Sequence, residues 1–125
     1  MPLPILEKKI LEAAAAAAKY EIVAWDDFNS ICSVRGRGIW DPLRSSKDAF
    51  DLLVAMRFSI NIQAAHVTIL SGNMIVSSQP SESNSNEDVA SAARHAIVVA
   101  ASSTQGVYQN DLRNTSPLNK LKVKP

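Results

Sequence analysis

Residues 40–57 read WDPLRSSKDAFDLLVAMR, and this stretch predicts a rigid corner that leads directly into an amphipathic helix. Pro42 fixes its own φ and disfavours helical geometry at Asp41, so the stretch begins with a non-helical turn. Ser45 or Ser46 can accept a hydrogen bond from the first helical turn, and Asp48 places negative charge at the positive end of the helix dipole. We therefore expect the helix to begin just after this corner.

The predicted helix, about residues 46–57, has one apolar face. Its apolar residues recur at the i, i+3, i+4 and i+7 positions of a helix that packs on a core, and Phe50 widens the same stripe. This set consists of Ala49, Leu52, Leu53 and Met56. Trp40 is expected to anchor the corner against the core under the helix.

Two further helices flank this region. Ile5 to about Lys19 has no helix breaker and contains six consecutive alanines, so we predict an N-terminal alanine-rich helix. Its alanine run is typical of close packing within one chain, or of self-association into a dimer. Ser85 or Asn86 precedes two acidic residues, which predicts a C-terminal helix over about residues 87–103, with Gly106 as its stop.

Alternating apolar and polar residues between these helices predict short strands. Ser59 to Gln63, Val67 to Leu70 and Met74 to Ser78 read as an antiparallel meander. Tyr20 to Trp25 and Ile31 to Val34 are two further β-prone runs. The predicted fold class is α+β: about three to five short antiparallel strands packed with three helices.

Length and composition indicate one domain. The chain of 125 residues has 46% hydrophobic and 20% charged residues, which is an ordinary globular balance. We assign residues 1–106 to a single α+β domain and residues 107–125 to a polar, basic tail expected to be flexible. No run of about 20 apolar residues is present to span a membrane, and we predict a cytoplasmic protein.

Charge and residue types narrow the chemistry. A net charge of +1 argues against an acidic nucleic-acid mimic and gives no broad support for non-specific DNA binding. The single Cys32 cannot form an internal disulfide and is expected to be a small buried side chain. No catalytic constellation, metal-ligand cluster or cofactor fingerprint is present, so we predict no enzyme activity, no metal and no cofactor.

The loop Arg35-Gly36-Arg37-Gly38 is the most functional-looking segment. Its glycines allow a tight turn, and its arginines could hold a phosphate or carboxylate through bidentate contacts. It lacks the further residues of a Walker loop or a dinucleotide fingerprint, so an ordinary hairpin turn with solvated arginines is the alternative. The candidate binding residues are Arg35, Arg37, Arg44 and Trp40.

Several of these segments together resemble a known family. The turn Trp40-Asp41-Pro42-Leu43, the helix segment DAFDLL, the meander and the closing AARHAIVVAA are similar to small phage and prophage proteins of the phage ABA-sandwich type. The similarity covers about residues 39–101, and it implies no activity or catalytic residue. The long alanine helix and the basic tail depart from the family pattern.

These observations lead to three functional hypotheses. We favour a phage accessory protein that binds a host or phage protein, such as a component of a host defence system, by surface contact. A nucleic-acid-binding module is the second, although the last helix begins with acidic residues where a basic terminus would be needed. The third is an oligomer, a dimer in its simplest form, that captures a small anionic nucleotide with the arginine loop.

Overall fold

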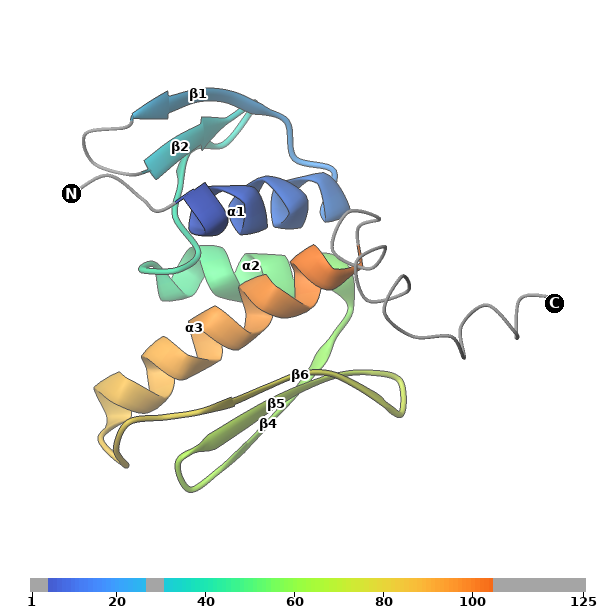
Figure 1. Ribbon diagram of the computed structural model, residues 1–125. Coiled ribbons are helices and arrows are strands. Elements are labelled where there is room, and N and C mark those ends of the chain that lie inside the picture. The colour runs from blue at the N-terminus through green and yellow to red at the C-terminus, as the bar shows by residue number, and fades with distance from the viewer. Residues whose placement is uncertain (1–4, 27–30, 105–125) are drawn as a thin grey trace, which may run out of the picture.

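The structure is a computed structural model that describes residues 5–26 and 31–104, and it has an α+β fold with two separate sheets. The helices are α1 (Ile5–Ala17), α2 (Ser46–Met56) and α3 (Asn86–Ser103). Sheet A contains β1 (Ile22–Asp26), β2 (Ile31–Val34) and β3 (Gly38–Trp40), and sheet B contains β4 (Ser59–Gln63), β5 (His66–Ser71) and β6 (Met74–Pro80). Figure 1 shows the helices as a middle layer between the two sheets.

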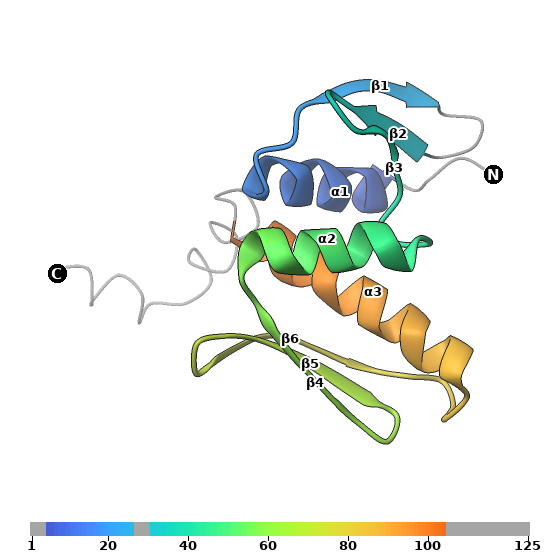
Figure 2. The same cartoon turned by 180° about the vertical axis from the view of Figure 1, so that it is seen from behind.

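Sheet B is the meander that the sequence predicts. Its strands are antiparallel neighbours in chain order, and β4 pairs with β5 without a register shift. The inner face of β5 carries Val67 and Ile69, which are fully buried beneath α3. The other face of the sheet lies open in Figures 1 and 2 and carries mostly polar side chains, as is usual for an antiparallel sheet covered on one side.

Sheet A is a second meander, and its last strand was not expected. The β-prone runs around Tyr20 and Ile31 do form strands, and Arg35 to Gly38 does form the turn after β2. The chain then continues as β3 and pairs with β2, which brings Trp40 opposite Cys32. Trp40 is therefore the last residue of a strand as well as the first residue of the predicted corner.

Helix α3 is the centre of the fold. It packs against α1, α2, β5 and β6. Its second half is buried at consecutive positions, including Ala96, Ile97 and Val98, because neighbours enclose it on more than one side. The sequence predicts one apolar face for this helix, but in its second half the buried residues lie on almost every side of the helix.

The alanine run of α1 packs inside the chain. Ala14 and Ala15 are buried, and α1 packs against α3, where small side chains let two helices approach closely. Ala14 and Ala15 are therefore used within the chain, while Ala16 of the same run is exposed, and self-association through this helix stays a prediction. Lys19 adopts a left-handed conformation, and the Tyr20 N–H bonds to the Ala15 carbonyl, which ends the helix slightly before the predicted position.

The two predicted caps and one predicted helix end are confirmed. Ser45 accepts a hydrogen bond from the Asp48 N–H at 3.2 Å, and Ser85 accepts one from the Asp88 N–H at 3.1 Å. Helix α2 ends at Arg57, which caps it in a left-handed conformation. The predicted stop at Gly106 and the predicted tail lie outside the described residues. Among the helices that the structure describes, none is long and apolar enough to cross a membrane.

Candidate functional site

Trp40 forms the floor of the predicted site rather than its surface. Its side chain is 1% exposed, and Tyr20 packs against it edge to face with ring centroids 5.5 Å apart. The Cys32 thiol, also buried, donates to the Trp40 carbonyl at 3.6 Å. Burial raises the pKa of Cys32 to about 11, so it is an unreactive thiol. Trp40 anchors the corner as predicted, but its assignment as a binding residue is corrected, because a partner cannot reach it.

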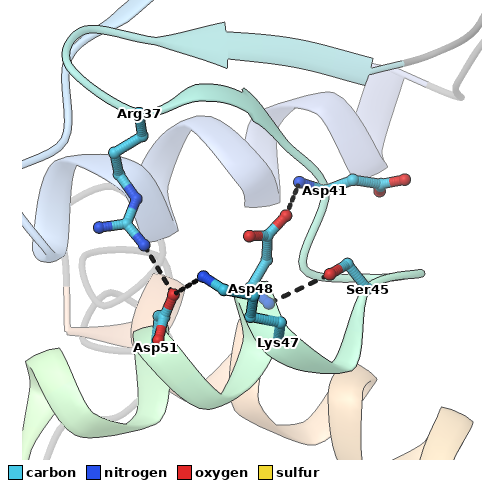
Figure 3. Close-up of polar contacts among 6 residues, drawn as sticks. All are labelled: Arg37, Asp41, Ser45, Lys47, Asp48 and Asp51. Carbon is cyan, nitrogen blue, oxygen red and sulfur yellow. Dashed lines mark hydrogen bonds and ion pairs between the residues drawn. The ribbon is translucent and has the colours of Figure 1, made fainter.

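The corner is held by polar contacts from two helices. The Asp41 N–H donates to the Asp48 carboxylate at 2.8 Å, so Asp48 reaches back past the cap to the Trp-Asp-Pro turn (Figure 3). On the other side, Arg94 of α3 donates to the Leu43 carbonyl and to the Ser46 hydroxyl, both at 3.0 Å. The start of α2 is therefore hydrogen-bonded both to the residue that follows β3 and to α3.

The three candidate arginines all lie near this corner, and each forms an ion pair within the chain. Arg35 contacts both carboxylate oxygens of Glu21, at 2.8 and 3.2 Å. Arg37 reaches Asp51 at 2.7 Å, and its guanidinium lies over the Tyr20 ring. Arg44 contacts Asp41 at 2.9 Å. The turn is thus a hairpin turn whose arginines are paired rather than simply solvated.

Electrostatics follow from these pairs. The hydrogen bond and the charge of Arg35 lower the pKa of Glu21, and the same hydrogen bond and the charge of Glu21 raise the pKa of Arg35. Lys47 also contacts Asp51, at 3.1 Å, and Figure 3 shows Lys47 and Arg37 meeting at that one carboxylate; together they lower the pKa of Asp51. Four cations each contact a carboxylate of the chain: Arg35 contacts Glu21, Arg44 contacts Asp41, and Arg37 and Lys47 share Asp51. A fifth, Arg94, also reaches the corner, but its partners are a carbonyl and a hydroxyl. An anionic ligand at Arg35, Arg37 or Arg44 would compete with a carboxylate of the chain.

No family model, curated protein or solved structure matches this chain. The resemblance to phage ABA-sandwich proteins therefore stays a prediction from the sequence.

Among the residues that the structure describes, one pair of side chains has the spacing of a catalytic base and a nucleophile. One hydroxyl and one imidazole are close, since His66 Nε2 lies 2.6 Å from Ser78 Oγ on the open face of sheet B. Among residues 5–26 and 31–104, however, no carboxylate hydrogen-bonded to the His66 ring is found, and both side chains are exposed. Three grouped metal-ligating side chains are also not found in those ranges.

The outward face of α2 carries the feature that sequence reasoning missed. Phe50 is 60% exposed and Val54 is 46% exposed, one helical turn apart. The prediction that Phe50 widens the core stripe is wrong, because Ala49, Leu52 and Leu53 already fill the buried face and Phe50 lies to one side of it. A helical wheel shows Phe50 and Val54 near Lys47 and Asp51, which is a signal the sequence did contain.

Proposed function

We propose that this protein is a non-enzymatic binding protein that recognises another protein through the outward face of α2. The observation that carries the proposal is the 60% exposure of Phe50 on a helix whose start is fixed at both sides. Burying an exposed aromatic ring on a rigid helix costs little conformational entropy, and such residues dominate many protein interfaces.

The surroundings of Phe50 support a protein partner over a nucleic acid. Val54 extends the apolar surface, and the Arg37–Asp51–Lys47 ion pairs border it. An apolar centre with a polar rim is the usual anatomy of a protein interface. Arg35, Arg37 and Arg44 each already contact a carboxylate of the same chain, which weakens the case for the nucleic-acid and nucleotide alternatives.

The biological setting of the proposal comes from the family resemblance of residues 39–101. On that resemblance we propose a phage or prophage accessory protein in the cytoplasm of a bacterial host, with a host or phage protein as its partner. A component of a host defence system is the target that we propose within that setting.

Affinity capture from bacterial lysate tests the proposal with three forms of the chain. Phe50→Arg removes the aromatic anchor, and Met74→Arg makes the same change at a side chain that is 69% exposed on β6. We expect a protein that wild type and Met74→Arg both capture and that Phe50→Arg loses. Losing one interface anchor typically weakens binding by about 2 kcal/mol, or about thirtyfold. Equal capture by all three forms would contradict the proposal, as would a nucleic acid as the retained partner.

A further inference from the structure

Each of the two sheets has two edge strands, and three of these four edges are protected. An edge strand presents unpaired backbone groups, and natural proteins protect it by shortness, bulges, charge or proline. β1 has an irregular register between Ile22 and Ala24, and β3 is only three residues long. β6 has an irregular register opposite Ile69 and Leu70 and ends at Pro80.

β4 has none of these protections. Its sequence, SINIQ, contains no charged residue and no proline, and its pairing with β5 is regular throughout. Within sheet B, helix α3 packs mainly against β5 and β6. Ile62 of β4 is 50% exposed. Figures 1 and 2 place β4 on the same flank of the molecule as α2, at the edge of sheet B. Among residues 5–26 and 31–104, no strand other than β5 pairs with β4, so this edge offers its backbone groups to another strand.

The β4 sequence is complementary to itself. We propose that β4 pairs antiparallel with β4 of a second copy of this chain, about a twofold axis at Asn61, so that the two B sheets become one continuous sheet. This register places Ile60 opposite Ile62 of the second copy and Ser59 opposite Gln63 of the second copy. Apolar residues then meet apolar residues, and no like charges meet.

Backbone geometry allows this register. In an antiparallel ladder alternate residues direct their N–H and C=O groups to opposite sides, so Ile60 and Ile62 direct theirs to the same side. A twofold axis at Asn61 places Ile60 of one copy opposite Ile62 of the other. Because these two residues direct their backbone groups to the same side of the strand, the donors and acceptors of the two β4 strands match across the junction. Such a contact is closed, because the same patch is used by both copies and no free β4 edge is left. The pairing does not rest on the proposed role of α2.

Sedimentation of the full chain gives the first test. We expect a species of about twice 13.5 kDa at micromolar to millimolar concentration. Asn61→Lys sets two positive charges opposite each other at the axis and should raise the dimer dissociation constant at least about fivefold. Ser78→Lys is the matched control, because Asn61 and Ser78 both pair with Thr68, one on each edge of sheet B. A 13.5 kDa species alone in wild type, or equal effects of the two variants, would overturn the proposal.

Disulfide cross-linking tests the register itself. Directly opposite residues of antiparallel strands have Cα atoms about 4.5–5.5 Å apart, within disulfide reach. Mild oxidation of Asn61→Cys should therefore yield a covalent dimer, whereas Ser78→Cys should not. The native Cys32 is buried and does not compete. Cross-linking of Asn61→Cys no faster than that of Ser78→Cys would show that β4 does not pair with itself, and that its edge is free for a strand of another protein.

Discussion

The corner before α2 and the outward face of α2 adjoin each other, yet their side chains are used in opposite ways. At the corner, Arg35, Arg37 and Arg44 are each paired with a carboxylate of the same chain. On the helix face, Phe50 and Val54 are apolar and exposed. The difference teaches that the charged residues which attract attention in a sequence can be used within the fold, while apolar side chains assigned to the core can remain exposed.

If the corner is part of the core structure, truncating Trp40 should have the largest effect on stability among the variants considered. Trp40→Ala should lower the free energy of unfolding by about 3 kcal/mol or more, because a fully buried ring is replaced by a cavity. Urea denaturation monitored by circular dichroism measures this quantity. The neighbouring Ile39, which is 65% exposed on the same strand, provides the control, and Ile39→Ala should have little effect. Equal losses for the two variants would refute the anchoring role.

Arg94 tests whether α3 fixes the start of α2, with a smaller effect. Arg94→Met keeps the aliphatic stem but removes the donors to the Leu43 carbonyl and the Ser46 hydroxyl. We expect a loss of about 1.5–3 kcal/mol in the free energy of unfolding, the usual range for hydrogen bonds from a charged group. Thermal and urea unfolding would measure it. A stability like that of wild type would mean that the corner holds α2 without α3.

The ion pair between Glu21 and Arg35 should contribute the smallest effect on stability, and the pKa of Glu21 reports whether this pair forms. The Arg35 hydrogen bond is the main cause of its lowered pKa, followed by the Arg35 charge. A lowered pKa in the folded state means that this pair stabilises the fold above the ordinary pKa of glutamate, and that the contribution is lost as pH falls through the lowered value.

Carboxyl NMR titration measures that pKa directly. Arg35→Gln should raise the pKa of Glu21 towards its ordinary value, while Arg44→Gln should leave it unchanged, because Arg44 pairs with Asp41 instead. An unchanged Glu21 titration in Arg35→Gln would show that this ion pair does not persist in solution.

The α2 region shows how far local sequence rules extend. The corner, the Ser45 cap and the helix end follow from Pro42, the serines and the change of period, and all three were predictable. The meander of sheet B was predictable for the same reason, since its alternation and its turn at Gly72 are local signals.

What the sequence did not reveal depends on contacts between distant segments. Asp48 was expected at the helix start, but its bond to the Asp41 N–H requires the corner to fold back. The partners of Arg35 and Arg37 are 14 residues away along the chain in each case. Because ion pairing was not predictable from spacing, these arginines looked available. The apolar spacing alone assigns Phe50 to the core, because the sequence does not show that Ala49, Leu52 and Leu53 already fill the buried face.

The central claim is that recognition uses the α2 face and not the arginine turn, and calorimetric titration of the captured protein against two variants tests it most directly. Phe50→Arg should weaken binding about thirtyfold. Arg35→Gln should bind within about threefold of wild type, a difference under 1 kcal/mol, because Arg35 pairs with Glu21 and is not among the residues that border Phe50. Wild-type affinity in Phe50→Arg together with a large loss in Arg35→Gln would contradict the account and return the site to the arginine turn.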